Sequence, residues 1–102
     1  MINYEVNLWV DAGIAPAYRA WLATHVAEIL AIDGFIDATV SEVIDPAPAA
    51  GEVALCVRYR LRDQAALSTY LQEHAPRMRE AGITRFDGHF RAERRVLRDT
   101  GG

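Results

Sequence analysis

Hydrophobic and polar positions alternate strictly at the start of the chain. Between residues 2 and 10, every second position is apolar, and the positions between them are mostly polar. A period of two sustained over this length is typical of a β-strand with one buried face. The predicted buried side carries Ile2, Tyr4, Val6, Leu8 and Val10, and the opposite side carries Asn3, Glu5, Asn7 and Trp9.

Two later stretches repeat apolar residues at the spacing of an α-helix. The first follows the break DAGIAPA, where Pro16 suits the first helical turn, and it ends at DGF (33–35). The second follows Asp63, a suitable N-cap, and should bend or restart at Pro76, which cannot donate an interior hydrogen bond. The two stripes are Tyr18, Trp21, Leu22, His25, Val26, Ile29 and Leu30, then Leu67, Tyr70, Leu71, His74 and Met78.

Three more strands complete the expected set, at about 36–44, 53–61 and 89–97, and a proline-containing loop lies at 45–51. The resulting order, β-α-β-β-α-β, predicts an α+β, ferredoxin-like sandwich. In this fold a four-stranded antiparallel sheet carries two helices on one face. We expect a single domain over residues 1–98 and a disordered tail at 99–102.

Composition and charge exclude some classes of function. The net charge is −3, which argues against a general nucleic-acid binder, and no apolar run is long enough for a membrane span. The N-terminus has no secretory pattern and Cys56 is the only cysteine, so a cytoplasmic location is expected. All 11 cationic residues are arginines, seven of them from Arg77 onward. This bias indicates either an anion site or pairing between the two halves of the chain.

Histidines occupy equivalent places on the two helical stripes. His25 and His74 each follow an aromatic-leucine pair by three residues, as in WLATH and YLQEH. They are either neutral imidazoles hydrogen-bonded at the rim of the core, or acid–base or ligand-binding groups in a pocket between helices and sheet. Two histidines without spaced cysteines or carboxylates form no metal motif, so no metal site and no cofactor is predicted. The candidate ligand-binding residues are His25, His74, Trp21, Asn7 and Arg58.

The side of the sheet without helices must meet either solvent or another molecule. Trp9 and Cys56 are poor choices for a fully solvated surface. We therefore expect a homodimer in which two sheets meet face to face, with polar pairs and water between them. The candidate residues of this dimer face are Glu5, Trp9, Cys56, Arg60, Arg91 and Arg95.

Several segments resemble a family of short bacterial proteins of unknown function: WLATHVAEIL, YLQEHAPRMRE, RFDGHF and RRVL. The resemblance covers nearly the whole chain, and its most specific pieces are the His-Val, Glu-His-Ala-Pro and Arg-Arg-Val-Leu sequences. The family is similar in fold to dimeric α/β-barrel proteins, which implies a homodimer of that type. No catalytic residues carry over, because the family has no established ones.

Two classes of function stay open, and the sequence does not decide whether the protein is an enzyme. The first is a non-enzymatic module that binds a small ligand or a partner, since no nucleophile elbow, phosphate loop or zinc signature is present. The second is an enzyme similar to the cofactor-independent monooxygenases or haem-degrading proteins of the dimeric α/β-barrel group. Asn7, Trp21 and one of the histidines match the residue types of the haem-degrading proteins, although their spacing differs. Nucleic-acid binding is not expected, because Trp9 is the only aromatic on the free face.

Overall fold

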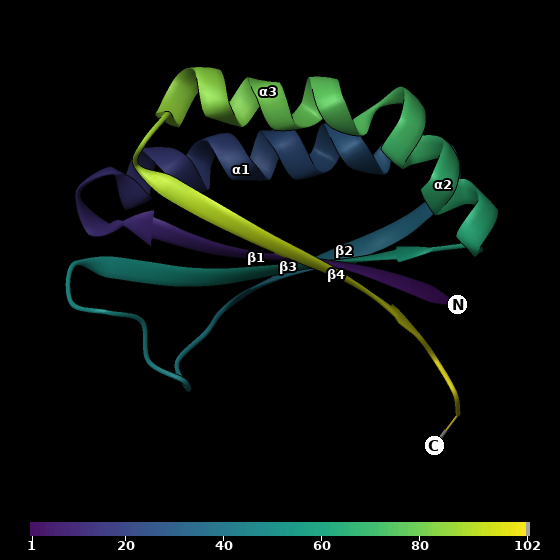
Figure 1. Ribbon diagram of the computed structural model, residues 1–102, viewed down its shortest axis with the longest axis horizontal. Helices are drawn as coiled ribbons and strands as arrows, with labels where there is room; N and C mark the ends of the chain where they lie inside the picture. The colour runs from purple at the N-terminus through teal and green to yellow at the C-terminus, as the bar shows by residue number, and fades with distance from the viewer. Residues whose placement is uncertain (102) are drawn as a thin grey trace.

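The computed structural model describes residues 1–101 and contains one four-stranded sheet and three α-helices. The elements follow the expected order along the chain, and all predicted strands are present (Figure 1). Their bounds are β1 (Ile2–Asp11), the 3-10 turn η1 (Ala12–Ile14), α1 (Ala15–Leu30), β2 (Phe35–Glu42), β3 (Glu52–Leu61), α2 (Gln64–Glu73), α3 (Ala75–Phe86) and β4 (Phe90–Arg98).

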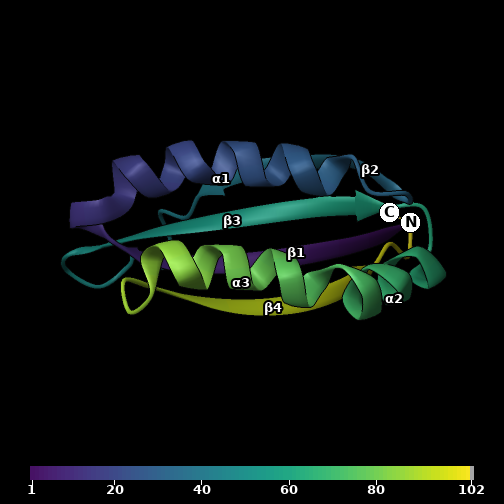
Figure 2. The same cartoon turned by 90° about the horizontal axis from the view of Figure 1, so that it is seen from above.

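The strands are antiparallel in the order β2-β3-β1-β4, and the helices cover one face of the sheet (Figures 1 and 2). This confirms the α+β, ferredoxin-like prediction. The register places Tyr4 opposite Tyr59 and Val6 opposite Val57, so the apolar sides of β1 and β3 meet beneath the helices. Alternation along β1 therefore identified the buried face correctly.

The second predicted helix is two helices in the structure. α2 ends at Glu73 and α3 begins at Ala75, with Pro76 in the first turn of α3, where a missing N–H costs least. The predicted restart is thus confirmed, and the Asp63 cap is also present, its carboxylate accepting from the Ala66 N–H at 2.8 Å. Leu71 is exposed rather than part of the core, because it lies at the edge of the apolar side that Ala66, Leu67 and Tyr70 form on α2.

The end of the chain lies beside its beginning. The Asp99 N–H donates to the Met1 carbonyl at 3.2 Å, and the Asn3 amide donates to the Asp99 carboxylate at 2.8 Å. Residues 99–101 form no regular element, and the last residue of the predicted tail, 102, lies outside the described residues. No helix within residues 1–101 has the length and apolar character needed to cross a membrane.

Candidate functional site

A cavity of about 270 Å³ lies between α1, α3 and the helix-covered face of the sheet. Five strand positions form its floor: Tyr4, Val6, Leu8, Val57 and Tyr59 lie on the central strands β1 and β3. The helices and β4 supply the walls and the mouth. These further lining residues include Tyr18, Trp21, Leu22, His25, Ile29, Tyr70, Met78, Arg79, Gly82, Ile83, Asp87, Phe90, Ala92 and Arg94.

Tyrosine hydroxyls give this largely apolar cavity its polar character. Tyr18, Tyr59 and Tyr70 are only 2–3% exposed, and no hydrogen-bond partner for their hydroxyls occurs among residues 1–101. Yet no buried side-chain oxygen in the described chain is both sealed from solvent and unpaired, so these hydroxyls must reach the open space. Burial raises the pKa of Tyr18 and of Tyr70 to about 12, and raises that of Tyr59 further. All three are therefore neutral hydroxyls that can donate or accept.

Trp21 and His25 form a stacked pair on the α1 side of the cavity. Their ring centroids are 4.5 Å apart and their planes differ by 20°. Gly82 of α3 makes room for this pair, because a Cβ at that position would lie 3.0 Å from Cη2 of Trp21. Glycine inside a helix is unfavourable by about 1 kcal/mol relative to alanine, so its presence here fits close approach of the indole ring.

His25 is a neutral base in this setting. Burial lowers the pKa of its imidazole; the Glu28 carboxylate opposes that shift, and the Arg94 charge adds to it. The side chain is half-buried and lies at the cavity wall, where the neutral ring offers one acceptor nitrogen and one N–H.

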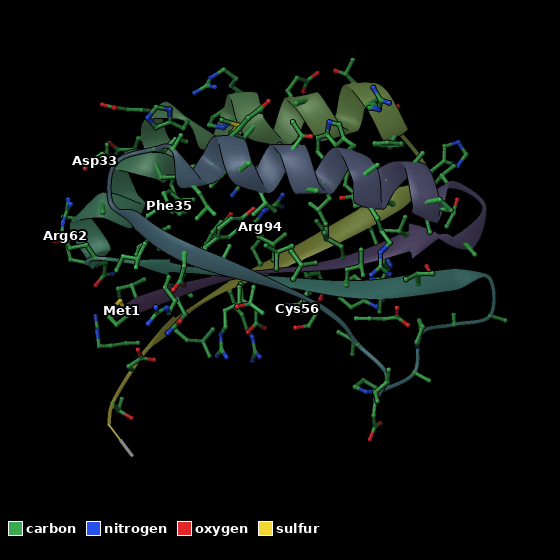
Figure 3. All side chains as sticks on the ribbon, turned by 180° about the vertical axis from the view of Figure 1, so that it is seen from behind. Met1, Asp33, Phe35, Cys56, Arg62 and Arg94 are labelled. Carbon is green, nitrogen blue, oxygen red and sulfur yellow. The ribbon has the colours of Figure 1, made fainter. Side chains whose placement is uncertain are left out.

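Three arginines line the cavity, Arg79, Arg91 and Arg94, and the sequence interpretation assigned none of them to it. Arg79 of α3 donates to the Tyr4 hydroxyl at 3.2 Å, and Arg94 of β4 lies between the helices and the sheet (Figure 3). Both are exposed, as are the nearby Ile83 and Val96, so the mouth opens between α3 and the edge strand β4.

The structure brings together only two of the five candidate ligand-binding residues, namely His25 and Trp21. His74 caps the junction of α2 and α3, where its Nδ1 lies 2.8 Å from Nη2 of Arg77, and it lines a separate surface depression. Asn7 and Arg58 lie on the opposite face of the sheet. The residue set considered for haem degradation is therefore not assembled in one cleft, because strand alternation separates Asn7 from Trp21.

The six candidate dimer-face residues all lie on the face of the sheet away from the helices. Glu5 is the centre of a polar network there: it is 6% exposed, and its Oε1 accepts from Arg95 at 2.7 Å and from Asn7 at 3.2 Å. Burial alone would raise the pKa of Glu5, but these hydrogen bonds, with the Arg95 and Arg58 charges, hold it below its usual value. The carboxylate is therefore ionised and paired.

Other parts of this face are also partnered. The Arg91 guanidinium stacks 4.0 Å from the ring centroid of Trp9, and Arg60 pairs bidentately with Asp37. Burial and the Glu5 charge raise the pKa of the Cys56 thiol, which makes it a poor nucleophile. Nowhere in residues 1–101 do three or more His, Cys, Asp or Glu side chains group closely enough to hold a metal ion.

Solved structures share this architecture over nearly their whole length. A Deinococcus radiodurans protein named as an antibiotic biosynthesis monooxygenase matches with a TM-score of 0.75 and 16% identity, covering 100% of this chain and 95% of its own. A variant of SnoaB, a cofactor-independent oxygenase from Streptomyces nogalater, matches with a TM-score of 0.67 and 15% identity, covering 99% and 95%. HapK from Hahella chejuensis gives 0.70 and 14%, covering 100% and 95%. At these identities the likeness shows the fold alone.

The sequence comparisons give the family of the chain. No curated protein matches the sequence significantly. The family described as a domain of unknown function, DUF4286, matches residues 1–100, which is almost the entire chain. The resemblance to short proteins of unknown function is thereby confirmed, and this chain belongs to the DUF4286 family.

Proposed function

We propose that this protein is a homodimeric small-molecule-binding protein whose ligand is a planar aromatic compound held in the cavity between α1, α3 and the sheet. The observation that carries the proposal is the set of tyrosine hydroxyls that open into this cavity. A core built only for packing could use phenylalanine at these positions. Hydroxyls that face an open cavity can instead exchange their bound water for the polar atoms of a ligand.

The size and the walls of the cavity support an aromatic ligand. A closed apolar cavity of about 150 Å³ holds benzene, so a volume of about 270 Å³ with an open mouth has room for two fused rings. Tyr18, Trp21 and Phe90 present ring faces and edges to this space, with centroid distances of 5.5 Å and 5.3 Å from Tyr18 to the other two. Such surfaces favour flat, polarisable molecules.

Filling the cavity tests this proposal. Ala92 lies on β4 and lines the cavity without belonging to the buried core. Ala92→Phe should abolish calorimetric binding of a two-ring probe such as naphthoate while leaving the melting temperature unchanged or higher. Ala23→Phe, on the exposed side of α1, is the matched control and should bind as the wild type does. Equal binding by both variants would contradict the proposed location.

The free face of the sheet supports a second copy of the chain as partner. Asn3 and Glu5 are buried there, and Trp9 is half-buried. The β2–β3 loop and the C-terminal segment both project on this side of the sheet (Figure 1). Ile44, at the start of that loop, is 80% exposed, which suits an apolar contact with a neighbouring protomer. Paired charges on this face would meet their copies through water rather than as bare ions.

Oxygenation of the bound ligand is a second candidate function. Its support is the neutral imidazole of His25 at the cavity wall, together with the likeness in fold to a cofactor-independent oxygenase. His25 would remove a proton from an activated methylene group, and the resulting carbanion would react with O2. One oxygen atom then becomes the carbonyl of the product, and the other leaves as water. No external reductant is needed for this balance.

Oxygen consumption distinguishes an oxygenase from a binding module. With 2-tetralone as substrate, a two-ring compound with an activated methylene group, the wild type should consume O2 faster than buffer. His25→Gln should lose most of that excess while still binding naphthoate. Consumption equal to the rate in buffer would remove the oxygenase candidate and leave ligand binding in place.

A further inference from the structure

We propose that Arg94 anchors a negatively charged oxygen, a carboxylate or a phenolate, on the aromatic ligand of the helix–sheet cavity. This inference rests on the proposed binding function and names the chemical class that the cavity selects. It starts from the position of Arg94 on β4, opposite Val6 of β1, which directs its side chain to the helix-covered side of the sheet (Figure 3).

The surroundings of Arg94 are aromatic and hydroxylated. The cavity that it lines also contains Tyr18, Tyr59, Tyr70 and His25. Burial has the largest effect on the pKa of each of these four groups. The positive charge of Arg94 has a smaller effect, and it lowers the pKa of all four. A guanidinium group offers five N–H donors and no acceptor, so it is suited to bind the oxygen atoms of a carboxylate or phenolate.

No protein group supplies those acceptors within residues 1–101. Arg94 forms no ion pair, hydrogen bond or stacked contact in this part of the chain, although every other arginine has at least one. Arg95, its neighbour, pairs with Glu5 at 2.7 Å on the other face. The remaining arginines are paired as follows: Arg19–Glu42, Arg58–Glu5, Arg60–Asp37, Arg62–Asp33, Arg77–His74, Arg79–Tyr4, Arg85–Phe86, Arg91–Trp9 and Arg98–Gln64.

The local charge balance favours an anion. Arg79 and Arg94 both lie at the cavity, whereas Asp87 is the only acidic residue among the described positions 1–101 that lines it. Arg91 also borders the cavity, but its guanidinium stacks on Trp9 on the far side of the sheet. A carboxylate or phenolate at Arg94 would accept charge-assisted hydrogen bonds from the guanidinium, and neutral tyrosine hydroxyls could donate to the same oxygen atoms. The aromatic body would then lie against Trp21 and Tyr18.

A pair of isosteric probes tests the charge requirement. Naphthoate carries the carboxylate, and naphthamide has nearly the same shape without the charge. By calorimetry, the wild type should bind naphthoate more tightly than naphthamide by about tenfold or more. Arg94→Gln should remove this preference, lowering the naphthoate affinity by about tenfold to a hundredfold and leaving the naphthamide affinity unchanged. Arg94→Lys should retain part of the preference, because it keeps the charge but loses the planar fork.

A matched control and the contrary outcomes complete the test. Arg98 lies four residues after Arg94 on β4, and its side chain donates to Gln64 outside the cavity. Arg98→Gln therefore removes a positive charge away from the cavity, and this variant should bind both probes as the wild type does. If naphthoate and naphthamide bind equally and Arg94→Gln changes neither, the anion inference is overturned while the binding proposal stands. If neither probe binds the wild type, both proposals are overturned.

Discussion

Arg94 and Arg95 are consecutive in the sequence and have opposite surroundings in the structure. Alternation along β4 sends Arg95 to the free face, where it pairs with the buried Glu5 carboxylate. The same alternation sends Arg94 toward the cavity and its tyrosine hydroxyls. The proposed function depends on the free face and on the cavity, and these two neighbouring arginines contribute one to each: Arg95 to the free face and Arg94 to the cavity.

His25 should make stability depend on pH in a recognisable way. Because burial lowers its pKa in the folded protein below the ordinary value of 6.5, the unfolded chain binds a proton first as the pH falls. The contribution of neutral His25 to the free energy of unfolding is therefore complete above the ordinary value. It is lost progressively as the pH falls from there through the lower pKa of the folded state.

Urea unfolding of wild type and His25→Gln at about pH 8 and about pH 5 measures this effect. The wild type should lose more stability on acidification than the variant, since glutamine does not titrate. The other titrating groups are common to both proteins and cancel in the difference. Equal losses would mean that the folded environment of His25 does not oppose its protonation.

Sequence reasoning could identify some site residues and not others. His25 and Trp21 lie on a continuous helical stripe, so their spacing alone placed them at the core side of α1. Arg94 was missed because an arginine in an edge strand is expected to face solvent, although its strand position matched the apolar side. Asn7 was a candidate by residue type only, and its place on the polar side of β1 separates it from the cavity.

At the level of elements, Gly34 fixes how α2 approaches the start of β2. It has a φ of +94°, and a Cβ on it would overlap the Cβ of Ala66. Gly34→Ala should therefore lower the free energy of unfolding by about 2–4 kcal/mol, as the sum of backbone strain and overpacking. Thermal or urea unfolding measures this change.

Alanine substitutions at two other glycines separate the effect of backbone strain from that of overpacking on the free energy of unfolding. Gly51 also has a positive φ, of +83°, but a Cβ there would meet nothing within 4 Å, so Gly51→Ala should cost only about 1 kcal/mol. Gly13 has neither constraint, and Gly13→Ala should leave stability unchanged or slightly higher. A loss at Gly34 no larger than at Gly51 would contradict tight packing between α2 and β2.

Element positions were largely predictable, and the way the helix that restarts at Ala75 packs was not. Period-two alternation in β1 and β3 and the stripe of α1 each depend on local spacing, which the sequence shows directly. The restart at Ala75 depends on how two short helices pack on the sheet. That packing places Arg79 of α3 at the cavity, which no local spacing indicates.

For the whole molecule, the proposed dimer predicts a defined oligomeric state. Sedimentation velocity at micromolar concentration should show a dimer for the wild type. Cys56→Arg adds a charge beside Arg58 and Arg95 at the centre of the free face, so it should shift the protein toward monomer. Thr24→Arg on the exposed side of α1 should remain dimeric. A monomeric wild type would contradict the dimer.

The position of the ligand is the claim on which the account depends most, and the two tryptophans report on it separately. Trp21 lines the cavity and Trp9 lies on the opposite face of the sheet. In a ¹⁵N–¹H spectrum, with the two indole signals assigned by Trp9→Phe and Trp21→Phe, titration with naphthoate should shift the Trp21 signal and leave that of Trp9 in place. A shift of Trp9 alone, or of neither, would contradict binding in the helix–sheet cavity.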